Sequence, residues 1–244
     1  MIDLHLHILP GIDDGPETMD EALELARALV QEGIRAAVAT PHYNDEFPPC
    51  PAAEVQARVY AMQRALDRYH IPLRLFPGHE VLIRPGLLED IRAGRIATLN
   101  GSRYLLLELW NSAWLSETER VIFELRAAGI VPILAHVERY RTFQHDHARL
   151  RNLLQQGALA QVTASSLPGM QGQTAKRCAE ELLKKGLVHC IASDAHSLRK
   201  RPPNVTGGLQ NAVRLVGSER LYQMIEVCPL AILNNQVCSP NSGN

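Results

Sequence analysis

The hydrophobic positions along the chain follow two patterns that alternate from end to end. Short runs of consecutive apolar residues, such as 104–107 and 131–135, are typical of strands buried on both faces of a parallel sheet. Between these runs, apolar residues recur every three or four positions, and Val55, Val59 and Met62 belong to one such stripe. The alternation repeats seven times and predicts parallel βαβ units.

Residues that begin and end helices sharpen these boundaries. Strands are predicted near the N-terminus and at residues 36–40, 73–76, 104–109, 131–135, 160–163 and 188–192, and helices at residues 18–32, 52–69, 85–93, 116–128, 148–156, 174–185, 209–216 and 218–227. Thr18 with Glu21 matches the capping box, in which a hydroxyl accepts a hydrogen bond from a backbone N–H three residues later. Ser116 with Glu119 repeats the motif, so each pair predicts the start of a helix.

Nearly every predicted strand ends in a side chain that can bind a metal ion. These residues are His5, His7, His42, Glu80, Glu108, His136, Asp194 and His196. A single histidine or glutamate at a strand end is usually a solvated cap or a satisfied core group, but that interpretation does not account for six strand ends. A closed barrel brings all its carboxyl strand ends to one face, whereas an open doubly wound sheet gathers two or three. The set therefore predicts an α/β barrel with a metal site at its mouth.

The remaining histidines lack this context. His145 and His147 repeat the spacing of the first pair, but they start a predicted helix with no strand before them, so we expect solvated rings. His189 should point toward the helices, and His79 should face away from Glu80 because neighbouring strand residues point to opposite sides.

Two arginines follow predicted ligands closely. Arg139 comes three residues after His136, and Arg201 comes five residues after His196. A guanidinium group can hold two phosphate oxygens at once, so both arginines are candidates to hold a phosphate group. The alternative for each is a solvated loop charge, and Arg199 and Lys200 compete with Arg201 for the role.

Composition limits the class of protein. With 244 residues, 46% of them hydrophobic, the chain can bury one large core, and we expect a single domain over residues 1–238 with a disordered tail at 239–244. A formal net charge of −1 gives no basic field for nucleic acid. The five cysteines are scattered without metal or disulfide spacing, which predicts no disulfide and favours a reducing cytoplasm. No leader and no apolar run of membrane-spanning length is present in the sequence.

The ligand types favour metal-dependent hydrolysis. Imidazoles and carboxylates without thiolates suit zinc, manganese or ferrous iron, and two or three ions fit the number of ligands. Ions held about 3.5 to 4 Å apart can lower the pKa of a water molecule and clamp the oxygens of a phosphoryl transfer. The chain has no Gly-x-Ser-x-Gly elbow, Walker loop or Gly-x-Gly-x-x-Gly motif, so the corresponding hydrolase, NTPase and dinucleotide functions are not indicated.

Several motifs together resemble those of one known family. They are His5-Leu6-His7, Asp13-Asp14-Gly15-Pro16, Thr40-Pro41-His42, Gly78-His79-Glu80, Ala135-His136-Val137-Glu138-Arg139-Tyr140, Ala192-Ser193-Asp194-Ala195-His196 and Arg201-Pro202-Pro203. The chain resembles the bacterial protein-tyrosine phosphatases of the polymerase-and-histidinol-phosphatase (PHP) superfamily, which are manganese-dependent enzymes of capsule and exopolysaccharide operons. The resemblance extends from residue 1 to about residue 235.

This resemblance implies a distorted seven-stranded barrel of the PHP type that holds three divalent ions, with manganese first and zinc or iron as alternatives. One ion would bind His5, His7, Glu80 and Asp194, the second Glu80, Glu108 and His136, and the third Asp14, His42 and His196. Asp13 remains a rival to Asp14. Arg139 and Arg201 would hold the substrate phosphate, and Asp194 counts as both ligand and catalytic residue. The implied substrate is phosphotyrosine on a membrane-associated tyrosine autokinase that regulates polysaccharide export.

The segment after Glu108 departs from the family pattern. It contains Trp110 and Trp114, which could form the walls of a pocket for a phenyl ring or be buried against the barrel rim. Two alternatives therefore stay open: a small-molecule phosphatase of the same superfamily, such as one for histidinol phosphate, and a non-catalytic metal-stabilised binding module.

Overall fold

The computed structural model describes residues 1–110 and 116–238. Within these residues the strands are β1 (Ile2–Leu6), β2 (Ala36–Ala39), β3 (His42–Tyr43), β4 (Arg74–Pro77), β5 (Glu80–Leu82), β6 (Tyr104–Glu108), β7 (Val131–Leu134), β8 (Leu159–Thr163) and β9 (Cys190–Ala192). The α-helices are α1 (Met19–Gln31), α2 (Ala52–Arg68), α3 (Leu87–Arg92), α4 (Thr118–Ala127), α5 (Arg141–His145), α6 (His147–Gln155), α7 (Gln173–Lys184), α8 (Val205–Val216), α9 (Ser218–Tyr222) and α10 (Cys228–Leu233).

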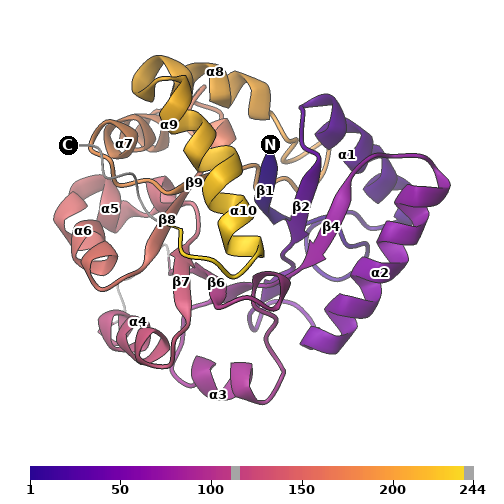
Figure 1. Ribbon diagram of the computed structural model, residues 1–244, viewed down its shortest axis with the longest axis horizontal. Helices are drawn as coiled ribbons and strands as arrows, with labels where there is room; N and C mark the ends of the chain where they lie inside the picture. Colours follow the sequence, from indigo (N-terminus) through magenta and orange to yellow (C-terminus); the bar gives the residue numbers. More distant parts are fainter. Residues whose placement is uncertain (111–115, 239–244) are drawn as a thin grey trace.

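All paired strands are parallel and form two sheets, with the orders β1-β2-β4 and β3-β5-β6-β7-β8-β9. β3 begins shortly after β2 ends, and β5 shortly after β4, so each pair continues one strand direction across a break. Counting each pair once leaves seven strand positions, as the resemblance implies. In Figure 1, helices α1 to α8 lie around the strands.

Hydrogen bonds connect the first strand with the segment after the last. The backbone nitrogen of Asp194 donates to the oxygen of His5, and that of His7 donates to the oxygen of Ala195, both at 3.0 Å. Leu6 and Ala195 form a parallel bridge. The predicted distorted barrel is thus the observed α/β architecture, and its ends meet at residues predicted to bind metal.

Buried apolar side chains form two clusters because successive strand residues point to opposite sides. Leu105 and Leu107 of β6 belong to the larger cluster, which includes the apolar faces of the helices. Leu106 of β6 belongs to the smaller one, with Ile133 and with Ile232 of α10. α10 crosses the strands in Figure 1 and contributes its apolar side chains to this smaller cluster.

Three boundary predictions were wrong. His42 was expected in the loop after the strand at residues 36–40, and Glu80 at the end of the third predicted strand, but they begin the short strands β3 and β5. The Thr18 cap forms, since its hydroxyl accepts from the Glu21 nitrogen, whereas the helix predicted from Ser116 begins at Thr118 without a side-chain cap.

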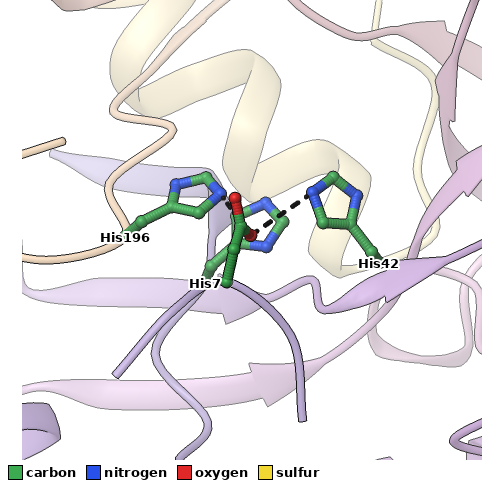
Figure 2. Close-up of side chains that lie close together, drawn as sticks. His7, His42 and His196 are labelled. Carbon is green, nitrogen blue, oxygen red and sulfur yellow. Dashed lines mark ion pairs between the residues drawn. The ribbon is translucent and has the colours of Figure 1, made fainter. Parts of the chain in front are cut away.

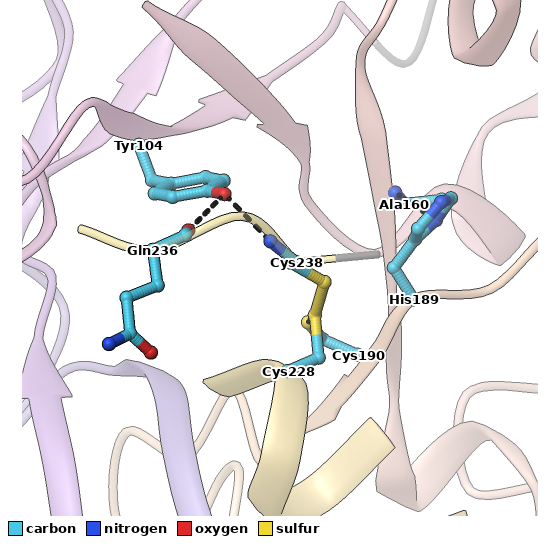
Figure 3. Close-up of a disulfide and its surroundings, with 7 residues drawn as sticks. All are labelled: Tyr104, Ala160, His189, Cys190, Cys228, Gln236 and Cys238. Carbon is cyan, nitrogen blue, oxygen red and sulfur yellow. Dashed lines mark hydrogen bonds between the residues drawn. A yellow bond between two sulfur atoms is a disulfide. The ribbon is translucent and has the colours of Figure 1, made fainter. Parts of the chain in front are cut away.

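The expectation of no disulfide was also wrong. Cys228 and Cys238 are bonded, and the Cys190 sulfur lies 3.5 Å from that of Cys228 (Figure 3). The tail returns to this position because the Tyr104 hydroxyl donates to the Gln236 oxygen and accepts from the Cys238 nitrogen. Such a return depends on a tertiary contact, so cysteine spacing could not indicate it.

Within residues 1–110 and 116–238, no helix combines the length and the apolar character needed to cross a membrane. The tail predicted at 239–244 lies outside the described residues.

Candidate metal centre

The structure brings the nine predicted ligands together at one mouth of the barrel. Donor atoms of seven of them form three overlapping groups, and His136 and Asp194 lie beside these groups. The groups are His5, His7 and Glu80; His42, Glu80 and Glu108; and His7, Asp14, His42 and His196. Within each group, one donor atom per residue lies within 4.8 Å of the others. Most of these side chains are buried, and Asp14, which is 38% exposed, marks the outer edge of the centre.

Glu80 occupies the middle of the centre. Its Oε2 lies 3.2 Å from Nε2 of His5, from Nε2 of His7 and from Nδ1 of His42. Its Oε1 lies 2.9 Å from Nε2 of His136. One carboxylate therefore faces four imidazoles, which fits the bridging position that the resemblance implies.

The remaining inner ligands complete this arrangement. Asp194 Oδ1 lies 3.3 Å from Nε2 of His5 and 3.8 Å from Nε2 of His7. Glu108 Oε1 lies 3.8 Å from Nε2 of His136. The contacts agree with the implied first and second ligand sets, although His42 is also close to Glu108, at 3.9 Å.

The outer group lies at the solvent side. Asp14 Oδ1 is 3.2 Å from Nε2 of His196 and 3.6 Å from Nε2 of His42 (Figure 2). The ring of His7 stacks on that of His196 with 3.7 Å between centroids. His7 thus lies between the inner and outer groups. The implied ligand sets placed it in the inner group alone.

The contacts divide the roles of the two neighbouring aspartates. Asp13 Oδ2 lies 2.7 Å from Nδ1 of His7 and accepts a hydrogen bond from the His42 backbone nitrogen. Asp13 therefore contacts the outward nitrogen of a candidate ligand, whereas Asp14 faces the group itself.

The backbone turns sharply at two of these positions. His136 has φ of 33° and Asp194 has φ of 52°, both in the left-handed region that is uncommon for residues other than glycine. Such conformations cost on the order of 1–3 kcal/mol and persist where the surroundings impose them. They redirect the chain directly after β7 and β9, which places both side chains at the mouth.

Burial and crowded negative charge define the electrostatics. Burial and the adjacent charge of Glu80 raise the pKa of Glu108 to about 8. Burial also opposes ionisation of Glu80, but the surrounding imidazoles, His5 foremost, outweigh it and hold its pKa well below the usual value. A divalent cation between these groups would stabilise both carboxylates in their charged form.

The chemistry of the donors fits such a cation. Among the residues that the structure describes, the buried atoms His42 Nδ1 and His196 Nε2 have no hydrogen-bond partner, and each lies 3.2 Å from a carboxylate oxygen. A set of imidazole and carboxylate donors without thiolates suits zinc, manganese or iron.

Both predicted arginines reach the mouth. Arg139 Nη1 lies 2.6 Å from Oδ2 of Asp194, and Arg201 forms an ion pair with Asp14. Each guanidinium group is therefore beside a candidate ligand, where a bound phosphate would compete with the carboxylate for it.

The other described histidines lie elsewhere. His79 and His189 contact backbone groups, and His147 contacts Lys185. His145 ends α5 outside the three groups. Trp110 is 45% exposed, and its indole nitrogen donates to the Ile83 oxygen. Trp114 lies outside the described residues.

Sequence reasoning missed Gln161 and Phe47. Gln161 Oε1 contacts both His5 and His136, and the Phe47 ring lies parallel to that of His42, with centroids 5.4 Å apart. Position 161 lies in a predicted strand on the interior face, where a buried glutamine is unusual, and this was the available signal.

Known proteins with similar sequences share the family indicated by these residues. The family model for capsular polysaccharide synthesis proteins of the CpsB/CapC type matches residues 1–234. The chain belongs to this family. Similar proteins include tyrosine-protein phosphatase YwqE of Bacillus subtilis (strain 168), 32% identical over 97% of this chain and 93% of YwqE. Putative tyrosine-protein phosphatase CapC of Staphylococcus aureus is 35% identical over 83% of this chain and 79% of CapC.

Solved structures agree. The chain matches a structure from a study of YwqE from Bacillus subtilis and CpsB from Streptococcus pneumoniae, described as unique metal-dependent tyrosine phosphatases, with a TM-score of 0.95 and 32% identity. The match covers 99% of this chain and 97% of that one. A β-aspartyl dipeptidase from Fervidobacterium islandicum matches at a TM-score of 0.59 and 13% identity, over 99% of this chain and 76% of that one, which shows a shared fold alone. The family predicted from the motifs is confirmed.

Proposed function

We propose that this member of the CpsB/CapC family is a metal-dependent protein-tyrosine phosphatase, a hydrolase of phosphoric monoesters that acts in capsule or exopolysaccharide synthesis. The observation that carries the proposal is the buried convergence of imidazoles and carboxylates on Glu80, with two arginines at its rim. The tyrosine-phosphatase names of the similar family members support the reaction and its substrate class.

We assign the centre three divalent ions, with manganese first and zinc or iron as alternatives. The proposed ligands are His5, His7, Glu80 and Asp194; Glu80, Glu108 and His136; and Asp14, His42 and His196. When bound, such ions supply an activated water as the nucleophile and offset negative charge on the phosphoryl oxygens. Manganese is favoured over magnesium because magnesium accepts imidazole ligands poorly.

The arginines bind and orient the phosphate in this proposal. Arg139 and Arg201 pair with Asp194 and Asp14, so each can exchange a carboxylate for a phosphate oxygen. Their charge then lies where the transition state becomes more negative. The phenolate of tyrosine, with a pKa of about 10, leaves without a strong general acid.

The proposed physiological substrate is a phosphotyrosine protein, specifically a membrane-associated tyrosine autokinase, met in the cytoplasm. Membership of the capsular polysaccharide synthesis family supports this setting. The hydrogen bonds between the first and last strands support one domain over residues 1–238.

Metal analysis combined with phosphatase assays tests the proposal. Purified protein should contain more than one divalent ion per chain and hydrolyse a phosphotyrosine peptide. Chelation should abolish activity, and manganese should restore it better than magnesium. Full activity in excess chelator would contradict the metal requirement. Tight metal binding without hydrolysis of any phosphoester would instead indicate a binding module.

A further inference from the structure

Gln161 of β8 lies beneath the metal centre and contacts two candidate ligands at once. Its side chain is fully buried. Its Oε1 atom lies 3.0 Å from the backbone nitrogen of His136 and 3.1 Å from Nδ1 of His5. These two residues belong to β1 and to the turn after β7, so one amide joins distant parts of the centre.

The first contact fixes how the amide is oriented. A backbone N–H can only donate, so the side-chain atom facing the His136 nitrogen must be the oxygen. His5 Nδ1 meets that same oxygen and must therefore carry a hydrogen. In the neutral ring, the lone pair is then on Nε2, which faces Glu80 Oε2 at 3.2 Å and Asp194 Oδ1 at 3.3 Å.

The contact to the His136 nitrogen also acts on the backbone of that residue. This residue has φ of 33°, and its left-handed conformation directs Nε2 to within 2.9 Å of Glu80 Oε1. A buried N–H without an acceptor is unfavourable, so the Gln161 oxygen stabilises the conformation that presents this ring.

We propose that Gln161 is a positioning residue for metal binding, which sets the tautomer of His5 and holds the backbone of His136. This inference rests on the proposed metal ligation and adds a residue that makes no contact with the ions. Acceptors on the outward nitrogen of a metal-binding histidine typically change metal affinity by about 10–100-fold.

Three variants test it by metal affinity, measured by competition with a chromogenic chelator in the absence of substrate. Gln161→Leu keeps the approximate volume but removes the acceptor, and should weaken manganese binding by about 10–100-fold. Gln161→Glu keeps an acceptor for both contacts and should stay within about threefold of the wild type. Thr163→Val is the matched control because the Thr163 hydroxyl, two residues along β8, is buried without a hydrogen bond.

The outcomes separate this inference from the proposed function. Wild-type protein that binds no metal would contradict the proposed function. Wild-type affinity in Gln161→Leu would overturn the positioning role and leave that function intact. Should Gln161→Leu fail to fold by circular dichroism, the test passes to Gln161→Glu, where retained affinity supports the role and a loss of tenfold or more overturns it.

Discussion

A histidine ring has two nitrogens, and the contact made by one decides what the other presents. Asp13 approaches Nδ1 of His7, and the backbone oxygen of Asp194 lies 3.0 Å from Nδ1 of His196. Both rings thus direct Nε2 toward the centre. The metal centre is built from ligands together with the acceptors behind them.

Ligand loss and loss of a phosphate holder should have different signatures. His136→Ala should lower metal content and reduce turnover by orders of magnitude, because the nucleophile depends on the ions. Arg139→Ala should keep the metal content and lower kcat/KM by about 100-fold, since it removes a charged contact to phosphate. Metal analysis and steady-state kinetics on the same preparations check both.

The double variant His145→Ala, His147→Ala is the control and should match the wild type. Equal metal loss in both test variants would show that the division of roles is wrong.

A second prediction concerns pH and His189. Burial lowers the pKa of His189 to about 4, and its Nδ1 accepts a hydrogen bond from the Ala160 nitrogen (Figure 3). The unfolded state gains a proton near pH 6.5, whereas the folded state resists it until about pH 4. The contribution of His189 to stability is therefore present above pH 6.5 and is lost progressively as the pH falls to about 4.

Denaturant unfolding of chelated protein between pH 7.5 and 4 measures this effect. The free energy of unfolding should fall by about 2 kcal/mol less in His189→Gln than in the wild type, at roughly 1.4 kcal/mol per pKa unit and with a discount for partial exposure. Parallel profiles for wild type and His189→Gln would contradict the assignment.

At the residue level, the sequence indicated which candidate ligands would lie together, because parallel strands bring their ends to one face whatever the details of packing. It could not separate Asp13 from Asp14, since both follow β1 in one loop and differ only in direction. Gln161 was missed because the sequence argument considered only imidazole and carboxylate side chains, and the role of Gln161 depends on two tertiary contacts.

Among the elements, α8 shows how packing overrides propensity. The helix was predicted from residue 209, but it begins at Val205 and includes both Gly207 and Gly208, although glycine disfavours a helix interior. A Cβ at Gly208 would lie 2.3 Å from the backbone oxygen of Ala164, so the helix approaches the turn after β8 at a distance that only glycine permits. α10 escaped prediction similarly, because its burial depends on the barrel interior it covers.

The two glycines of α8 give a matched pair of variants. Gly208→Ala should destabilise the protein by about 1–3 kcal/mol, because the added methyl group meets backbone that cannot move aside easily. Among the described residues, and apart from the helix's own backbone and the two chain neighbours, no atom lies within 4 Å of a Cβ at Gly207, so Gly207→Ala should stabilise the helix by up to about 1 kcal/mol. Denaturant midpoints compare the two, and equal effects would contradict the close approach.

At the scale of the whole molecule, the net charge is too small to attract an anionic substrate, so substrate binding depends on particular charged and aromatic side chains near the centre. The formal net charge is −1, so the chain has no general attraction for an anionic substrate, and binding depends on the arginines at the mouth. Beside the centre, Phe47 stacks on His42 and Trp110 is half exposed. These rings are candidate walls for the phenyl group of phosphotyrosine.

The last prediction concerns which phosphoester the metal centre hydrolyses best. Phosphotyrosine peptides should show kcat/KM at least about 100-fold above phosphoserine peptides or histidinol phosphate, because a phenolate leaves more readily than an alkoxide and the rim can bind its ring. Trp110→Ala should reduce this preference if the rim binds the ring and leave it unchanged if leaving-group chemistry alone sets it. Phe123→Ala removes an exposed ring from α4 and serves as the control. The metal centre could hydrolyse either ester, so the measured preference decides between them. A higher kcat/KM for histidinol phosphate would therefore assign the chain to small-molecule substrates.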